Sequence, residues 1–329
     1  MKIFEQIKIT FQRDLPFVAY RKPNENQLSA FFQQTNDLFF TEEFSESGFV
    51  FSPFSNKEKS ILTPANQSEF IQEKIEFLIK ESGEETSIVD ESSKENHIKL
   101  VKKGIEAIEQ HQFDKVVLSR KEIVQLENFD LIETYQKLLQ NYPNAFVYVW
   151  FHPKVGLWLG ATPETLVKIK GNQFETMALA GTQSYNGTTN VTWNQKEIEE
   201  QQIVTNYIVA NLKSSVERLN VGKVETVKAG SLLHLKTKIT GQLKDNNSKV
   251  ITSVLHPTPA VCGMPLQSSR QFILDNENYN RSFYTGFLGE LNIDKTSRIF
   301  VNLRCMEIEN NTVSIYIGGG ITKDSNPEK

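Results

Sequence analysis

Apolar and polar residues follow strand-like patterns along the last two thirds of the chain. Short runs of β-branched and aromatic residues stand between turn-forming residues, and such runs are typical of strands. The pattern predicts strands over residues 113–119, 146–151, 156–160, 166–169, 174–178, 298–303 and 312–317. Several of the connecting loops are short, so neighbouring strands should run antiparallel. We therefore expect an α+β fold in which a largely antiparallel sheet packs against helices.

One segment, residues 194–219, has the pattern of an amphipathic helix. Its apolar residues recur at intervals of three and four, and they are Val204, Ile208, Leu212, Val216 and Leu219. Glu197 and Glu200 extend the same face toward the start of the helix. A carboxylate on a buried face must be paired, protonated or bound to a cation. Because the chain has no cysteine or histidine cluster, an all-oxygen Mg²⁺ site is one interpretation, and stabilisation by the helix dipole is the other.

A polar segment separates the first part of the chain from the rest. Residues 80–97 are rich in Glu, Ser and Asp, and Ile88 and Val89 are their only aliphatic residues. We interpret this segment as a linker within a single domain, 1–329. Residues 1–95 would form an N-terminal part of the scaffold, because they are few and carry no motif, while 96–329 carry the candidate chemistry.

Composition and charge narrow the classes of function. The chain has 329 residues and a net charge of −4, which gives no electrostatic reason to expect binding to nucleic acid or to an anionic membrane. Cys262 and Cys305 are too few for a disulfide framework, and no CxxC pair suggests zinc. No apolar run approaches the ~18 residues of a transmembrane helix, and the N-terminus has no signal-peptide pattern. We expect a cytoplasmic protein with no membrane association.

Residues 256–265 (HPTPAVCGMP) form the most distinctive run of the sequence. Pro257 and Pro259 restrict the backbone, and the small residues Ala260 and Val261 follow them. A stiff segment with small side chains suits the wall of a pocket for a small polar ligand. An ordinary rigid loop has the same composition, so the run alone does not decide between the two.

Two further residues are candidates for a base and an acid. In an extended strand Lys115 shares a face with Val117, and a lysine removed from water can serve as a general base. A lysine that protects a sheet edge from aggregation is the alternative. Glu164 follows Thr162 and Pro163 in a pattern typical of a helix start, with Thr162 as the cap. A catalytic role for Glu164 requires that it faces the same cavity as Lys115.

Three places in the sequence are suited to binding anions. Gly181, between Ala180 and Thr182, would let backbone N–H groups approach a ligand closely, and so would residues 318–320. Arg304 offers a forked pair of donors for a carboxylate. Residues 318–320 lack the spacing of a dinucleotide-binding loop, so we expect no nucleotide cofactor.

Taken together, these segments resemble the chorismate-utilising enzymes, and most closely the isochorismate synthases. The resemblance runs from about residue 100 to the C-terminus, and its segments come in the family's order. They are 115–120 (KVVLSR), 160–164 (GATPE), 179–182 (LAGT), 196–200, 233–235 (LHL), 256–260 (HPTPA), 281–289, 303–305 (LRC) and 316–321 (YIGGGI). The resemblance implies a fold like that of anthranilate synthase component I, in which two large antiparallel β-sheets form a central sandwich and helices pack outside.

By that resemblance the chain is an enzyme, a Mg²⁺-dependent isomerase that moves the hydroxyl group of chorismate from C4 to C2. Lys115 matches the base that activates the attacking water, and Glu164 matches the acid that protonates the leaving hydroxyl. Glu200 matches a Mg²⁺ ligand, and Glu197 is a candidate partner of the ion through water. The matching substrate-binding positions are Gly181, Thr182, His234, Ala260, Tyr284, Arg304, Gly318 and Gly319. The product would serve menaquinone or siderophore biosynthesis.

Several positions help to distinguish between the branches of the family. Ala180 stands where aminodeoxychorismate synthases have a nucleophilic lysine, and Lys115 is typical of the members that use water. We therefore expect no amidotransferase subunit. Ala260 and Val261 resemble the isomerases, whereas Tyr284 resembles the salicylate-forming branch. A salicylate synthase, which also eliminates pyruvate, therefore stays open as an alternative.

The end of the sequence leaves a third alternative. In relatives, the segment that matches 325–329 continues into a helix with a further Mg²⁺ ligand and a carboxylate-binding lysine, whereas this sequence stops at Lys329. We interpret the sequence as truncated and expect weak metal binding and little turnover from these 329 residues. A catalytically impaired chorismate-binding chain is therefore the alternative to an active synthase. Nothing in the sequence indicates an obligate assembly, and we expect a monomer.

Overall fold

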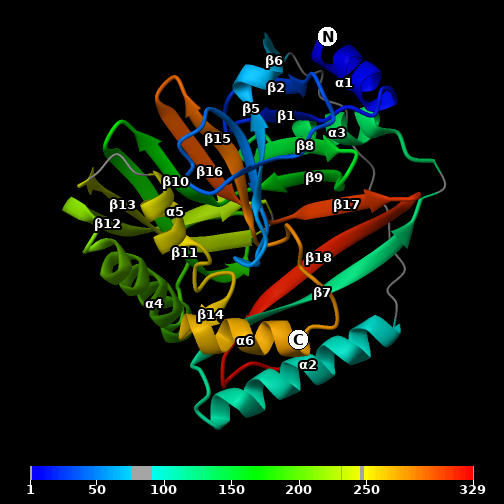
Figure 1. The fold of residues 1–329 in the computed structure, drawn as a ribbon. Coiled ribbons are helices and arrows are strands. Elements are labelled where there is room, and N and C mark those ends of the chain that lie inside the picture. Colours follow the sequence, from blue (N-terminus) through cyan, green and yellow to red (C-terminus); the bar gives the residue numbers. More distant parts are fainter. Residues whose placement is uncertain (1, 76–90, 127, 231, 245–247, 329) are drawn as a thin grey trace.

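The computed structural model describes residues 2–75, 91–126, 128–230, 232–244 and 248–328. Their strands form two large sheets (Figure 1). Neighbouring strands of the first sheet are, in order, β14 (Gly263–Met264), β7 (Lys115–Gln125), β18 (Thr312–Ile321), β17 (Cys305–Glu309), β9 (Gly156–Thr162), β8 (Phe146–His152), β1 (Phe17–Arg21), β2 (Gln27–Gln33) and β6 (Ser68–Lys74).

The second sheet also combines strands from the N-terminal part of the chain with strands from later parts. Its neighbouring strands are β12 (Val216–Ala229), β13 (Leu232–Leu243), β11 (Gln173–Ser184), β10 (Thr165–Lys170), β16 (Thr296–Val301), β15 (Phe287–Ile293), β4 (Gly48–Ser52), β5 (Ser60–Pro64) and β3 (Phe39–Thr41). Every pairing between these described strands is antiparallel. The predicted α+β class with antiparallel sheets is confirmed.

The two sheets bury an aromatic core between them. Its buried residues include Tyr20, Phe31, Phe146, Tyr148, Trp150 and Trp158 from the first sheet and Phe49, Phe51, Leu288 and Phe300 from the second. The rings of Phe146 and Phe300, one from each sheet, stack with their centroids 4.2 Å apart. Aromatic residues bury large apolar areas and interlock in defined geometries. This core therefore holds the two sheets together as the predicted sandwich.

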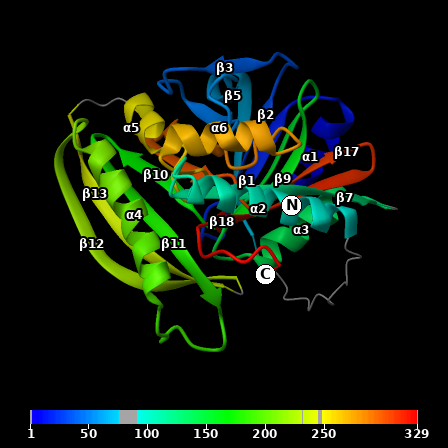
Figure 2. The ribbon, with the colours of Figure 1, turned by 90° about the horizontal axis from the view of Figure 1, so that it is seen from below.

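Helices cover the outer faces of the sandwich (Figures 1 and 2). Helices α1 (Lys2–Gln12) and α3 (Leu131–Asn141) share a buried cluster with the outer face of the first sheet. Helices α4 (Gln195–Leu212) and α5 (Ser248–Leu255) do the same on the second sheet. Helices α2 (Glu91–Glu109) and α6 (Leu266–Asn276) pack against β7, and a short 3₁₀ turn, Ala65–Gln67, precedes β6.

The helix predicted over 194–219 ends earlier than its apolar spacing indicated. Helix α4 stops at Leu212, the chain turns over 213–215, and Val216 and Leu219 lie in β12. These two residues join the same apolar cluster as Ile208 of α4. Their spacing fitted the helical period because both the helix and the strand face one core, so the boundary prediction was wrong.

The linker predicted over 80–97 was also partly wrong. Residues 76–90 lie outside the described residues, but 91–97 form the first two turns of α2. This helix is amphipathic, and Val101 and Ile108 bury its apolar face against β7. Gly104 brings the helix close, since a Cβ there would lie 2.9 Å from a methyl carbon of Leu118. The polar residues 93–97 therefore belong to the partly exposed first turns of a packed helix.

Strands from the N-terminal part of the chain extend both sheets. β1, β2 and β6 complete one edge of the first sheet, and β3, β4 and β5 complete one edge of the second. The description of the chain as a single domain stays a prediction. No helix among the described residues has the length and apolarity to cross a membrane.

We predict that Ile208→Ala destabilises the fold, whereas Ile198→Ala on the same helix does not. Ile208 is 1% exposed in the core beneath the second sheet, and Ile198 is 46% exposed. Truncating a buried isoleucine costs about 2–5 kcal/mol of unfolding free energy, and a surface substitution changes it by about 0.5 kcal/mol or less. Urea unfolding followed by circular dichroism measures both. Equal losses for the two variants would contradict the placement of α4.

Candidate active site

One cavity brings together all of the site residues predicted from the sequence. It measures about 660 Å³ and is lined from both sheets, by β7 and β18 of the first and β11 and β13 of the second. The first turns of α4 and the segments around 260, 284 and 304 complete it. The predicted residues that line it are Lys115, Glu164, Gly181, Thr182, Glu197, Glu200, His234, Ala260, Tyr284, Arg304, Gly318 and Gly319. Segments far apart in the sequence therefore meet in one place.

Lys115 stands at the start of β7 and is buried, with 4% of its surface exposed. Val117 lines the same cavity, while Val116 and Leu118 on the other face pack with α2 and α6. The predicted alternation of the strand is therefore present. At Lys115 the strand pairs with Met264 of β14, and β18 pairs with β7 from Val116 onward, so the buried Lys115 does not face an open sheet edge. The alternative of an edge-protecting lysine is wrong for this residue.

The Lys115 amine donates a hydrogen bond to Glu200 Oε1, forming an ion pair whose carboxylate side chain is 23% exposed. Gly320 of β18 lies against this pair. A Cβ at that position would be 3.0 Å from Lys115 Cε and 3.4 Å from Glu200 Oε1. A buried ammonium needs a partner, and Glu200 provides the negative charge. The absence of a side chain at 320 leaves room for the two groups to meet.

Glu164 faces the same cavity, which was the condition for its catalytic role. It lies in the connection from β9 to β10, with 5% of its surface exposed. Burial raises the pKa of its carboxyl to about 7, and the positive charge of Lys115 opposes part of that rise. A carboxyl with such a pKa keeps its proton at neutral pH for a large share of the time. It is therefore suited to donate a proton.

The helix start proposed at Thr162 and Pro163 is not formed. The chain passes from one strand to the next, and Thr162 Oγ1 donates to the backbone oxygen of Val301. The backbone N–H of Val301 in turn donates to the oxygen of Glu164, 3.0 Å away. Thr162 therefore ties two strands of different sheets together, and these bonds hold Glu164 at their junction.

Gly181 marks a β-bulge in β11 and has a φ of +71°. The bulge shifts the register with β13 between Ala180 and Thr182. The Thr182 side chain is thereby turned toward the cavity. A Cβ on Gly181 would lie 3.1 Å from both the Cβ and the backbone oxygen of Glu197. Glycine at this position therefore allows the first turn of α4 to approach the sheet closely.

His234 of β13 lies beside the bulge. Its Nδ1 is 3.1 Å from the backbone oxygen of Gly181 and 3.2 Å from Thr182 Oγ1. Burial lowers the pKa of His234, and the charge of Arg304 lowers it further. The ring is therefore neutral at pH 7, and its Nδ1–H is the group that can donate to the Gly181 oxygen.

An aromatic stack forms another part of the wall. Tyr284 stacks on Tyr316 at 5.0 Å between centroids, and Tyr316 stacks on Trp158 at 5.6 Å. Burial raises the pKa of the Tyr284 phenol, so it stays neutral. A Cβ at Gly318 would lie 2.6 Å from the Tyr284 hydroxyl oxygen. The glycine therefore lets the backbone of β18 lie directly against this hydroxyl group.

The proline-rich run and Arg304 complete the lining. Ala260 and Val261 line the cavity, whereas Cys262 is fully buried on the other side, in the cluster with α2 and α6. The pocket-wall interpretation of 256–265 is therefore the one that the structure supports. Arg304 follows β16 with a φ of 49° and carries its guanidinium toward Gly230 at the tip of the β12–β13 hairpin.

The two acidic residues on α4 offer oxygen ligands. Glu197 and Glu200 are one helical turn apart and both line the cavity. Glu197 Oε2 is buried and has no hydrogen-bond partner, which is an arrangement that a cation would relieve. Among the described residues, no group of three or more His, Cys, Asp or Glu side chains is close enough to hold a metal ion. Water and a bound ligand would have to supply the remaining positions.

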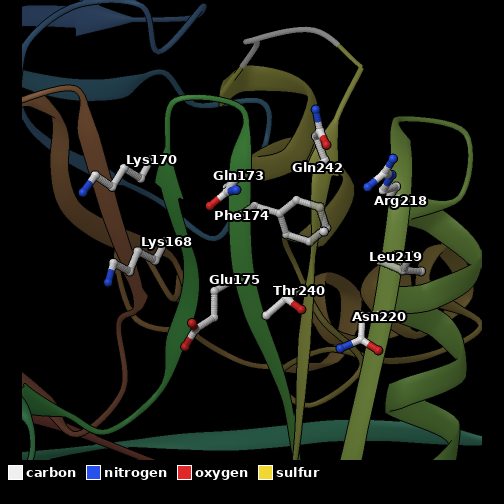
Figure 3. A pocket seen from close by; sticks show the side chains of 11 residues that line it. Lys168, Lys170, Gln173, Phe174, Glu175, Arg218, Leu219, Asn220, Thr240 and Gln242 are labelled. Atoms are coloured by element: carbon white, nitrogen blue, oxygen red, sulfur yellow. The ribbon is translucent and has the colours of Figure 1, made fainter.

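A second, larger cavity of about 810 Å³ lies at the other end of β10 to β13 (Figure 3). Lys168 and Lys170 of β10 line it on one side and Arg218 of β12 on the other. Its acidic residue, Glu175, pairs with Lys238 at 2.8 Å, and both side chains are about half exposed. None of the predicted site residues lies there, and it has no buried acid and base that face each other. Its size alone does not make it the site.

Comparisons with known proteins agree with this geometry. The family described as "Chorismate binding enzyme" matches residues 41–329. The chain belongs to this family.

Individual relatives and solved structures show what the chain is similar to in more detail. The chain is 29% identical over 247 residues to isochorismate synthase DhbC of Bacillus subtilis, a match that covers 69% of this chain and 62% of that protein. The chain thus spans about three fifths of the length of that curated relative. A putative 2,3-dihydroxybenzoate-specific isochorismate synthase from Bacillus anthracis superposes with a TM-score of 0.80 at 23% identity, covering 98% of this chain and 94% of that one.

A third comparison is with MenF, the menaquinone-specific isochorismate synthase of Escherichia coli. The TM-score is 0.78 at 21% identity, and the match covers 95% of this chain and 84% of that chain. At these identities the two structural matches establish the fold. The resemblance read from the sequence, and the fold it implied, are therefore confirmed.

Some lining residues of this family member were predicted only as parts of longer segments. Gly320 belongs to the predicted run 318–320, and Lys196 belongs to the matching segment 196–200. Strand pairing gives Gly320 its individual place, because it lies opposite Val117 in the β7–β18 ladder. That pairing is a long-range contact with no signal in either segment alone. Lys196 precedes Glu197 in the first turn of α4, so the helix start was its only local signal.

We predict that Gly320→Ala lowers the stability of the protein, whereas Gly319→Ala leaves it nearly unchanged. The added methyl group at 320 would press on the Lys115–Glu200 pair, while a Cβ at 319 meets nothing within 4 Å. Overpacking a filled site costs about 1–3 kcal/mol, and a substitution into open space changes stability by about 0.5 kcal/mol or less. Thermal unfolding of both variants measures the difference. Equal melting temperatures would show that 320 tolerates a side chain.

We also predict that Glu164 makes the protein less stable as pH rises. Its pKa is about 7 in the folded protein and near 4.5 when unfolded, so the folded state holds the proton more tightly. The stabilisation is full below pH 4.5 and is lost as pH rises through 7, with a total of about 3 kcal/mol.

Urea unfolding of the wild type and of Glu164→Gln at several pH values between 4.5 and 8 tests this dependence. The difference in unfolding free energy between the two proteins should change across that interval, because glutamine cannot ionise. A difference that stays constant with pH would show that the Glu164 carboxyl has an ordinary pKa.

Proposed function

We propose that this chain is an isochorismate synthase, an isomerase that converts chorismate to isochorismate. The observation that carries the proposal is the presence of a buried amine, Lys115, and a protonatable buried carboxyl, Glu164, in one cavity. The names of the relatives add support, because the curated matches are isochorismate synthases. The substrate is then a small molecule with two carboxylates and a hydroxyl group.

The proposed reaction needs one base and one acid. Lys115 takes a proton from a water molecule as the water oxygen bonds to C2 of the ring. Both double bonds of the ring shift by one position, and the C4–O bond breaks as Glu164 gives its proton to the departing hydroxyl, which leaves as water. To act as a base, the Lys115 amine has to leave the ion pair with Glu200 and give up its ammonium proton first. The pKa of about 7 at Glu164 suits an acid that works near neutral pH.

In this proposal, cationic and backbone groups around the cavity bind the substrate. We assign one carboxylate to Arg304, whose fork suits two parallel hydrogen bonds. Thr182, Gly318 and Gly319 offer a hydroxyl group and backbone atoms that a ligand can approach closely. The neutral ring of His234 and the small side chain of Ala260 shape the remaining space.

We propose Mg²⁺ as the cofactor, with Glu200 and Glu197 as its protein ligands. Their carboxylate oxygens are the ligand type that Mg²⁺ prefers, and the unpartnered Oε2 of Glu197 supports the assignment. Bound there, the ion would neutralise and orient a substrate carboxylate. With two protein ligands, binding should be weak. We assign the product to one of the two routes named for the solved relatives, 2,3-dihydroxybenzoate or menaquinone formation.

The direct test is to incubate the protein with chorismate and Mg²⁺, separate the products by liquid chromatography and identify them by mass spectrometry. Isochorismate has the mass of chorismate, so a second chromatographic peak of that mass is the expected result, and its formation should require the added metal ion. Salicylate with pyruvate would indicate the synthase of the salicylate branch instead. Binding of chorismate without any product would show a binding chain and would contradict the proposed activity.

We predict that Lys115→Ala and Glu164→Gln each lower turnover by about 10²–10⁴-fold. Chorismate affinity should change little, because both substitutions leave Arg304 and the backbone groups in place. Lys121→Ala is the matched control, since Lys121 lies on the same strand, with its side chain 29% exposed, and pairs with Glu307 at 3.9 Å. Steady-state kinetics and calorimetric binding measure the two effects. Full turnover by Lys115→Ala would remove the lysine from the mechanism.

A further inference from the structure

A buried ion pair lies directly behind the cavity wall. Arg281 Nε donates to Glu277 Oε2 at 2.7 Å, and Arg281 Nη2 donates to Oε1 at 2.6 Å. The two side chains are only 2% and 1% exposed. Neither residue is among those that line the cavity. The proposed chemistry therefore does not use this pair.

Arg281 donates three further hydrogen bonds, and each goes to a residue that lines the cavity. Nη2 donates to the backbone oxygen of Val117 at 2.7 Å, and Nη1 donates to that of Val261 at 3.1 Å. Nη1 also lies 3.3 Å from Thr285 Oγ1. These acceptors belong to β7, to the proline-rich wall and to the turn that follows Tyr284. One guanidinium thus joins three separate segments of the wall.

Glu277 holds a fourth point near the cavity wall, at Ser119 of β7. Its Oε1 accepts from the backbone N–H of Ser119 at 2.7 Å and from the Ser119 hydroxyl at 2.9 Å. Ser119 lies four residues after Lys115 on β7 and is paired with Gly318 of β18. The carboxylate therefore holds β7 at Ser119, and the guanidinium holds it at Val117, between Ser119 and Lys115.

We propose that the Arg281–Glu277 pair is a positioning device, which sets β7 and its Lys115 amine against the opposite walls of the cavity. The proposal rests on the proposed isomerase function. A planar guanidinium can serve a carboxylate and three other acceptors at once, whereas an ammonium cannot reach them all. Loss of the fork should let the strand and the 258–262 segment shift. A displacement of about 1 Å at a reacting group can lower the rate by ~10²-fold.

The test compares Arg281→Lys and Glu277→Gln with two matched controls far from the cavity. Arg21 is 3% exposed and donates to three backbone oxygens, those of Leu139, Tyr142 and Ala145. Glu290 is 3% exposed and accepts from Tyr20 and Lys22. Arg21→Lys and Glu290→Gln therefore remove equivalent buried bonds without touching the cavity wall.

We expect all four variants to have lower melting temperatures than the wild type. Arg281→Lys and Glu277→Gln should also lose about 10²-fold in kcat/KM for chorismate, mostly in kcat, because the anion-binding groups are intact. The two controls should keep the wild-type kcat and KM. A loss of activity that follows the loss of stability equally in all four would overturn the proposal, and so would wild-type kinetics in both site variants.

Two other results are decisive in different ways. If both site variants fail to fold while both controls fold, the pair serves the fold and the proposal is wrong. If the wild type makes no isochorismate, the proposed function fails, and the pair is then judged by hydrogen–deuterium exchange at β7. Faster exchange at β7 in the site variants but not in the controls supports the positioning role. Equal exchange at β7 in all four overturns it.

Discussion

The buried amine of Lys115 is the constraint around which the rest of the site is built. An ammonium group that is 4% exposed requires a negative partner, and Glu200 of α4 provides one. The same positive charge opposes the rise that burial causes in the pKa of Glu164. One amine therefore pairs with Glu200 and acts on Glu164, two carboxyl groups that come from different parts of the fold. Any displacement of the start of β7 changes both interactions.

The double-sheet sandwich brings these elements together. Lys115 is on the first sheet, the glycine bulge and His234 are on the second, and the aromatic core between the sheets fixes their separation. The helix that carries Glu197 and Glu200 is anchored to the second sheet by Gln201, which donates to the oxygen of Ala178 at 3.1 Å. The cavity thus lies where both sheets and one helix meet, and its geometry follows from their packing.

Small residues determine how closely the walls of the cavity approach one another. Gly181 allows α4 to approach β11, Gly318 allows β18 to lie against a tyrosine hydroxyl group, and Gly320 leaves space for the ion pair. The proline-rich run supplies Ala260 and Val261 to the opposite wall, which Arg281 ties to β7. Hydrogen bonds from outside the cavity therefore hold β7 and the proline-rich run in place.

Local patterns in the sequence determined most strands, the α+β class and the residue types of the site, because strand alternation and the motifs are short-range signals. The same local reasoning extended one helix past Leu212, assigned a helix start to Thr162 and took the start of α2 for a linker. It failed there because residues of a helix and of the next strand can face one core, and because a threonine can bond to a distant strand as readily as cap a helix.

Only the tertiary structure decided that Lys115 bonds to Glu200, that Gly320 makes room for them and that Arg281 holds three walls together. The first contact joins residues 85 positions apart, and the last set joins Arg281 to residues up to 164 positions away. No local pattern encodes such distances, since they arise from how the sheets pack.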